Sequence, residues 1–317
     1  MVESTPSASA AEPEQPAAVP TATVDRSNDG CRVVVEVDVP AGVDDVWESV
    51  ATGEGYLRWF VTAELEPREG GRLITHHGDF GDSEGIITQW EPGRHHYAYV
   101  EADWMGDGTP VPDWHTEITL APASVPVPVS VPDAAEPRTR VRLSSGIDTE
   151  GEQWAEDIVG TVDGWTSALR TLAEYHAHFA GRQTAQALVM LSVPARHRLP
   201  GLLGLDGAAV GSRSSVHATA GGQPQRVTGT VIEIREGPDG GRQSPESVVL
   251  RVPDGEEAAP GIWEFGTVQY GDTRMSVVRA YLHLPKDAEP DVTEVARRTE
   301  QAWTAVLEDL EASSESR

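Results

Sequence analysis

Aromatic side chains are the residues of this chain whose types and positions point most clearly to a chemistry. Seven of its nine tryptophans lie in the first half of the chain, taken here as residues 1–181, and only Trp263 and Trp303 lie in the second. Tyrosine and phenylalanine follow the same distribution. Aromatic side chains that gather in one domain either fill its core or line a pocket for an apolar molecule. If either half binds a hydrophobic ligand, we therefore expect the first half to do so.

Histidines come nearest to a metal-binding pattern. Two adjacent pairs, His76-His77 and His95-His96, fall on neighbouring predicted strands, and His115 follows further along. Three imidazoles can bind zinc, but adjacent residues on a strand point to opposite faces, so at most one of each pair could reach a common site. Neither H-E-x-x-H nor a helical H-x-x-x-H is present. We therefore predict no metal site and interpret these side chains as polar residues that line a cavity.

Motifs of other catalytic sites lead to no defined reaction. The chain has no P-loop and no G-x-G-x-x-G motif followed by a helix. Its single cysteine, Cys31, excludes an internal disulfide and a multi-cysteine metal site. No nucleophile can be paired with a base, so we predict no catalytic residues and no cofactor. The enzymatic alternative is a cyclase or hydrolase in which His96 or His115 faces a cavity beside a carboxylate.

The composition is that of a soluble globular protein, with 38% hydrophobic residues and a mean hydropathy of −0.35. Its net charge of −27 repels nucleic acid backbones and anionic lipid, so we expect neither as a partner. No stretch approaches the roughly 18 consecutive apolar residues that cross a bilayer. The N-terminus lacks the basic and apolar regions of a secretory signal. We expect a cytoplasmic protein.

Two long amphipathic helices are predicted to position these residues, over residues 157–179 and 294–311. Apolar residues recur in the first at steps of three and four. Both helices contain W-T-x-x-L-x-x-L, which begins at Trp165 and at Trp303. An extended apolar run that ends in Val-Pro precedes each helix. We infer an internal duplication whose first copy carries a Pro-rich insert over residues 121–137.

The remaining elements predict an α+β fold. Residues 1–28 are rich in Ala, Pro, Ser, Thr and Glu and are expected to be disordered. A strand over 33–39, two short helices within 43–60 and an antiparallel meander from 64 to 143 follow. The second half repeats the scheme more faintly, with a Gly- and Pro-broken segment over 197–205 in place of a good helix. A long helix buried against a curved antiparallel sheet accounts for this order.

Four motifs carry a resemblance to a known family. They are V-x-V-x-V-P-A-x-x-x-D-V-W at 35–47, Y-L-x-W-F at 56–60, E-P-R-x-G-G at 66–71 and G-W-x-x-x-L-x-x-L at 164–172. With them, residues 32–180 resemble the activator of heat-shock-protein ATPase homologue family, a branch of the START-like (SRPBCC) superfamily with the helix-grip fold. The resemblance implies two tandem helix-grip domains, residues 29–181 and a degenerate copy over 182–317.

This resemblance also implies a deep cavity between sheet and long helix, used across the superfamily to hold hydrophobic molecules. We expect the N-terminal domain to bind a small hydrophobic ligand and the C-terminal copy to be structural. Alternate strand positions and the helix face point inward in such a fold. The residues predicted to bind the ligand are Trp59, Trp90, Tyr97, Tyr99, Trp114, His115, Trp165 and Leu169. A chaperone-ATPase cofactor or another protein-interaction module is the alternative, and would expose an apolar patch for a protein partner.

Overall fold

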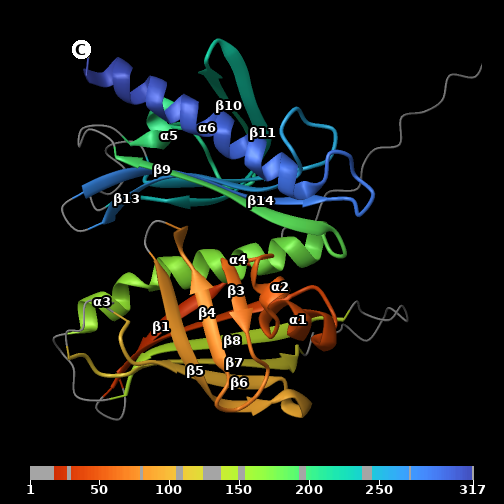
Figure 1. Ribbon diagram of the computed structural model, residues 1–317, viewed down its shortest axis with the longest axis vertical. Coiled ribbons are helices and arrows are strands. Elements are labelled where there is room, and N and C mark those ends of the chain that lie inside the picture. Colours follow the sequence, from red (N-terminus) through yellow and green to blue (C-terminus); the bar gives the residue numbers. More distant parts are fainter. Residues whose placement is uncertain are drawn as a thin grey trace, which may run out of the picture.

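A computed structural model describes residues 18–26, 30–78, 81–104, 110–123, 137–148, 154–192, 198–237, 245–270 and 273–315. It is an α+β structure in which two antiparallel sheets are each accompanied by a long helix (Figure 1). The first sheet and its helices come from residues 21–178, and the second sheet and its helices from residues 183–315.

The first sheet has eight strands in the order β1-β2-β8-β7-β6-β5-β4-β3. Its strands are β1 (Thr21–Asp25), β2 (Cys31–Val39), β3 (Thr62–Leu65), β4 (Arg72–His76), β5 (Asp82–Glu91), β6 (His96–Glu101), β7 (Trp114–Pro122) and β8 (Thr139–Ile147). Its helices are α1 (Val43–Val50), α2 (Gly53–Tyr56), a 3-10 turn at Pro92–Arg94, α3 (Ala155–Gly160) and α4 (Val162–His178). Alternate residues of β2, from Val33 to Val39, are buried in the core against α4, because successive strand residues point to opposite faces.

The second sheet has six strands in the order β10-β11-β12-β13-β14-β9. They are β9 (Gln183–Ser192), β10 (Arg213–Ala220), β11 (Gln223–Arg235), β12 (Ser247–Val252), β13 (Gly261–Tyr270) and β14 (Thr273–Leu284). Its helices are α5 (Leu199–Leu202) and α6 (Val292–Glu315). Trp303, Val306 and Leu307 of α6 are buried against this sheet, at the spacing of one helix face.

The two sheets share one strand order. Without β1 and β3, the first sheet is β2-β8-β7-β6-β5-β4, and the second is β9-β14-β13-β12-β11-β10. The pairing of β5 with β6 shifts register between Ile87 and Gln89, and that of the matching strands β11 and β12 shifts between Val231 and Glu233. The six shared strands therefore have the same order in both sheets, with a register shift in the matching strand pair.

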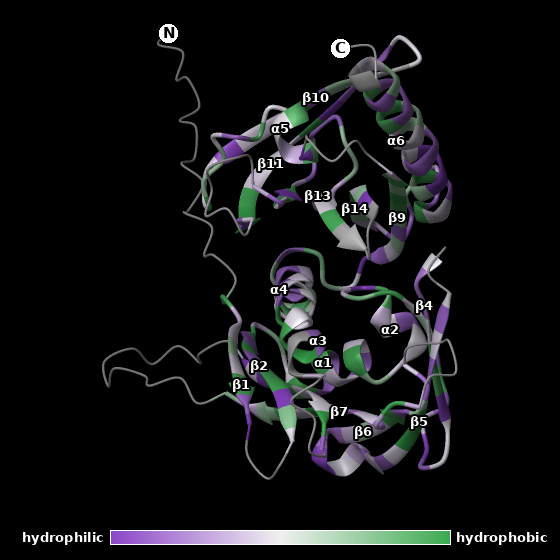
Figure 2. Cartoon of the chain, turned by 90° about the vertical axis from the view of Figure 1, so that its left-hand side faces the viewer, coloured by the Kyte–Doolittle hydropathy of each residue, from purple (hydrophilic) through white to green (hydrophobic). Residues whose placement is uncertain are grey.

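Helix α4 lies between the two sheets (Figures 1 and 2). Ala168, Leu169 and Leu172 pack into the core of the first sheet. Tyr175 and the following Phe179 form a separate buried cluster with apolar side chains of the second sheet, namely Ile232, Val249, Ile262 and Tyr281. The outer face of the second sheet is therefore an internal interface, and α4 joins the two halves of the chain.

Three expectations about the elements need correction. Residues 21–25 are not disordered, since they form β1 and pair with β2. All five side chains are exposed, so the strand depends on backbone hydrogen bonds and leaves no hydrophobic pattern in the sequence.

The helix predicted over 157–179 is divided into α3 and α4 at Thr161, whose Oγ1 donates to the carbonyl of Ile158 at 2.8 Å. Strand β10 was not predicted, and residues 1–17, 27–29 and 124–136 of the predicted tail and insert lie outside the described residues.

Candidate functional site

Most of the residues predicted to bind a ligand come together in the core of the first half. Trp59, Tyr97 and Leu169 have no exposed surface, and Tyr99 and Trp114 are buried. The hydroxyl of Tyr97 donates to the carbonyl of Val50 at 2.7 Å and lies 2.5 Å from the hydroxyl of Tyr56. Burial raises the pKa of Tyr97 well above its ordinary value, so this phenol stays protonated at neutral pH.

Two tryptophans of this cluster also have hydrogen-bond partners within the protein. Trp59 Nε1 donates to the carbonyl of Ser49 at 3.0 Å, and Trp114 Nε1 donates to Ser145 Oγ at 2.8 Å. Trp90 and Trp165 are partly buried and pack against the same core. The ring of Trp165 stacks on Phe60 with centroids 5.1 Å apart. A ligand among these side chains would have to compete with contacts already made.

His115 is the predicted ligand-binding residue that the structure does not bring into this cluster. It follows Trp114 on β7, so the two side chains point to opposite faces of the sheet. His115 Nδ1 lies 3.7 Å from Asp148 Oδ2, and His96 Nε2 lies 3.1 Å from Glu117 Oε1. Both imidazoles are near a carboxylate, as the enzymatic alternative requires, but on the outer face of the sheet rather than beside the core.

A serine motif overlooked in the sequence gives no nucleophile either. Residues 81–85 read G-D-S-E-G, the form of the nucleophile elbow, in which serine lies on a sharp turn between a strand and a helix. Ser83 instead lies within strand β5, and its Oγ donates to Glu101. Among the described residues, no three His, Cys, Asp or Glu side chains are placed to hold a metal ion. None of the helices in the described part of the chain is long and apolar enough to cross a membrane.

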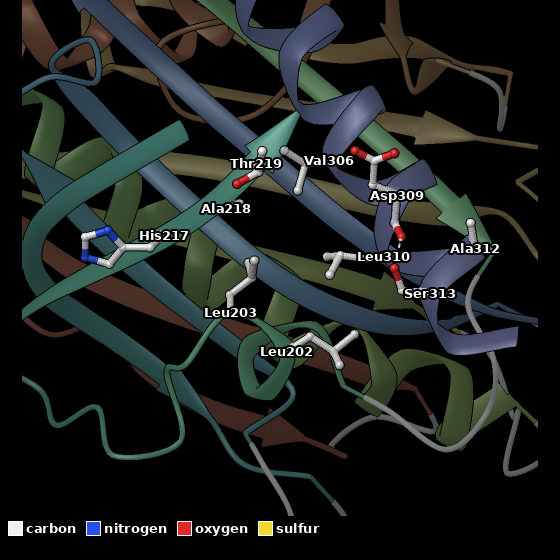
Figure 3. A pocket seen from close by; sticks show the side chains of 10 residues that line it. All are labelled: Leu202, Leu203, His217, Ala218, Thr219, Val306, Asp309, Leu310, Ala312 and Ser313. Atoms are coloured by element: carbon white, nitrogen blue, oxygen red, sulfur yellow. Dashed lines mark hydrogen bonds between the residues drawn. The ribbon is translucent and has the colours of Figure 1, made fainter. Parts of the chain in front are cut away.

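The described residues of the second half line a hollow that we call the α6 groove (Figure 3). Its volume is about 800 Å³, which lies within the range of small-molecule sites. Residues of α5, β10 and α6 form its walls, together with Leu203 directly after α5. The lining comprises Leu202, Leu203, His217, Ala218, Thr219, Val306, Asp309, Leu310, Ala312 and Ser313.

The spacing of apolar residues along α6 determines which of them line the α6 groove. Trp303, Val306 and Leu307 are all buried in the core, and Leu310 is partly buried against it. Val306 and Leu310, four residues apart on α6, also line the groove beside β10. The short helix α5 opposes them with Leu203. In Figure 3 the side chains of Leu203, Val306 and Leu310 gather around the hollow.

Polar groups lie at the rim of the groove. Asp309 and Ser313 are exposed on α6, and Ser313 Oγ donates to the carbonyl of Asp309 at 2.7 Å. His217 of β10 is exposed and points away from the centre of the hollow (Figure 3). An apolar wall with a polar rim suits a molecule that has an apolar body and a few hydrogen-bonding groups.

The sequence contained a weak signal for this site. Val216, Ala218 and Ala220 alternate with His217 and Thr219, the period of a half-buried strand. That run is short and its small residues are common in loops. The Gly and Pro residues of the segment 197–205 predict an interrupted helix. In the structure Leu199 is nevertheless buried there, and its backbone N–H donates to Thr267 Oγ1 at 2.7 Å. Pro200 occupies the first turn of α5, where a proline needs no hydrogen-bond partner.

No family model and no curated protein matches this chain. Among solved structures, CalU16 from Micromonospora echinospora is 19% identical over 50% of this chain and 83% of its own, with a TM-score of 0.36. DynU16, from the dynemicin biosynthetic locus, is 18% identical over 89% of this chain and 98% of its own, with a TM-score of 0.36. The di-domain ARO/CYC BexL, from the BE-7585A biosynthetic pathway, is 14% identical over 86% and 93%, with a TM-score of 0.39. Because these sequence identities and TM-scores are low, the function is inferred from the geometry of this chain alone.

Proposed function

We propose that the chain is a tandem helix-grip protein of the START-like type, with domains over residues 29–181 and 182–317, and that it binds a small hydrophobic molecule. The α6 groove carries this proposal. It lies between a long C-terminal helix and its sheet, the place where the family resemblance implies a cavity. Its volume of about 800 Å³ and its leucine-lined wall suit an apolar ligand.

The C-terminal domain is favoured over the N-terminal domain as the binding half. Three of the N-terminal aromatic residues that the sequence suggests as the site, Trp59, Tyr97 and Trp114, have their polar atoms bonded to protein groups. An apolar ligand gains most where apolar surface still faces open space. Leu202, 39% exposed, and the partly buried Leu310 offer such surface at the α6 groove. The N-terminal core remains the alternative location for the same function.

Binding without turnover is the activity that we propose. A general acid or base must come within about 3 Å of the atom it serves. His217 points away from the groove (Figure 3), and Asp309 and Ser313 are exposed at its rim. These positions suit orientation of a ligand better than proton transfer to its centre.

Titration with the neutral, fluorescent dye Nile red tests this proposal. Leu310→Trp should fill the groove and weaken dye binding about tenfold or more, since it removes the space for the apolar body. Gln301→Trp is the matched control, because it adds the same side chain at an exposed position of α6. Trp165→Ala examines the N-terminal alternative. Dye binding that Leu310→Trp leaves unchanged and Trp165→Ala abolishes would move the site to the first half.

A further inference from the structure

A second hollow lies where the two halves meet, and we call it the inter-sheet pocket. Its volume is about 220 Å³. Helix α4 contributes Ser167 and Thr171, and the outer face of the second sheet contributes Arg235, Glu264, Arg279 and Tyr281. The pocket thus needs both halves of the chain, and it shares no residue with the α6 groove.

The charges that line this pocket do not balance. Arg235 Nη2 donates to Glu264 Oε1 at 2.8 Å, whereas Arg279 Nη1 lies 3.7 Å from Glu264 Oε2. One carboxylate therefore faces two guanidinium groups. Burial opposes the charge on Glu264, but Arg279 and Arg235 hold its pKa below the ordinary value, so it stays ionised. Glu233, which lies near Arg235, forms an ion pair with Arg170, whose Nε is 2.9 Å from Glu233 Oε2.

Within the described part of the chain, Arg279 has one N–H group without a partner, although its guanidinium also interacts with Glu264 and Tyr281. Its Nε is buried and has no hydrogen-bond partner among the described residues. A buried N–H group without a partner is costly, and an anion would remove that cost. The Arg279 side chain as a whole is 31% exposed, whereas its Nε is buried, so an anion would approach Nε through the pocket that this side chain lines. A guanidinium group with an unpaired N–H can bind a carboxylate, because a carboxylate accepts two parallel N–H hydrogen bonds.

The rest of the lining restricts the size and shape of the anion. Tyr281 O–H already donates to the carbonyl of Phe60 at 2.8 Å, and Thr171 Oγ1 donates to the carbonyl of Ser167 at 3.0 Å. Phe60, Val249 and Ile262 give the pocket an apolar side. A flat apolar body beside Phe60 with its charged end at Arg279 would satisfy both parts of the lining.

We propose that the inter-sheet pocket binds a small aromatic or otherwise flat organic carboxylate, whose carboxylate pairs with Arg279. This inference goes beyond the proposed function, because it concerns a separate site and a charged ligand. A ligand held by α4 and by the second sheet also stabilises the contact between the two halves, since only the docked arrangement binds it.

Fluorine NMR with 4-fluorobenzoate tests this inference on the full chain, with uncharged 4-fluorobenzamide as the matched probe. The acid should bind at least about tenfold more tightly than the amide, as expected for a charged hydrogen bond. Arg279→Gln should remove this preference. Equal affinity for the two probes in the wild-type protein would overturn the inference.

Two glycines of the α3–α4 region provide a test that leaves the charges intact. A Cβ atom added at Gly164, which lines the pocket, or at Gly160, which does not, meets no atom within 4 Å. Gly164→Leu should abolish 4-fluorobenzoate binding and Gly160→Leu should preserve it. Retained binding in Gly164→Leu would contradict the inference. Leu310→Trp, which fills the α6 groove, should not change benzoate binding, so the failure of one site is distinguishable from the failure of the other.

Discussion

Glu174 of α4 accepts a hydrogen bond from Arg251 of β12 at 3.0 Å, and the two side chains are 3% and 8% exposed. The pair joins the helix of the first half to the sheet of the second in a place that water barely reaches. Arg251 also contacts His178 one turn further along α4 at 2.5 Å. The interface between the halves is therefore both apolar, around Tyr175 and Phe179, and ionic.

Loss of the Glu174 carboxylate should destabilise the whole chain. Glu174→Ala leaves Arg251 buried without this partner, which typically costs about 3–5 kcal/mol in the free energy of unfolding. Urea denaturation followed by tryptophan fluorescence measures the change. Glu308→Ala on the exposed face of α6 is the control and should change stability by less than about 0.5 kcal/mol. Equal effects of the two substitutions would show that the buried pair does not hold the halves together.

Two buried histidines should make the protein sensitive to acid. His283 contacts the rings of both Tyr175 and Phe179, and burial lowers its pKa to about 3. Burial likewise lowers the pKa of His176, whose Nε2 lies 3.0 Å from Ser49 Oγ, to about 4. Both values lie below the ordinary 6.5, so the unfolded chain binds these protons first. Stability is then complete above pH 6.5 and falls as the pH decreases toward 4 and 3, by about 2 kcal/mol per histidine at pH 5.

His283→Gln isolates one of these contributions, because the amide does not titrate. The variant should lose less stability than the wild-type protein between pH 7 and pH 5, by about 2 kcal/mol. Thermal denaturation across this range measures the difference. His217→Gln, at an exposed histidine, should follow the wild-type curve. If His283→Gln also follows the wild-type curve, the imidazole does not resist protonation as its burial implies.

The Tyr97 hydroxyl should matter for stability and not for binding. Tyr97→Phe removes the donor to the carbonyl of Val50 and the partner of the Tyr56 hydroxyl, so buried polar atoms lose hydrogen bonds. We expect a loss of about 1–3 kcal/mol in the free energy of unfolding. Nile red affinity should stay unchanged if the ligand occupies the α6 groove. A tenfold change in affinity at nearly unchanged stability would instead place the ligand in the N-terminal core.

The parts of the fold that periodicity describes could be predicted from the sequence. Trp165 and Trp303 indicated two long helices in matching positions, and the structure has both. Strand β12 coincides with a short apolar run that ends at Pro253. Such patterns indicate which side of a helix or strand is buried. They cannot predict a strand with no buried side chains, such as β1.

The sequence could not show which helix or strand packs against each face of a sheet. Glu264 and Arg279 alternate with apolar residues on β13 and β14, a pattern typical of a face exposed to solvent. In the structure they lie against α4, at the interface of the halves. The aromatic content of the first half indicated a ligand pocket, yet Tyr97 and Trp59 have the burial of core residues. Composition does not distinguish a filled core from a hollow one, because both need the same side chains.

Native mass spectrometry of the full chain, purified without added ligand, determines whether a small molecule occupies the α6 groove. We predict that the wild-type protein and Gln301→Trp carry an additional small mass that organic solvent extracts, and that Leu310→Trp carries none. An additional mass retained by Leu310→Trp would contradict binding in the α6 groove. Protein that is free of any such mass in all three forms, and that Nile red does not bind, would contradict the proposed function itself.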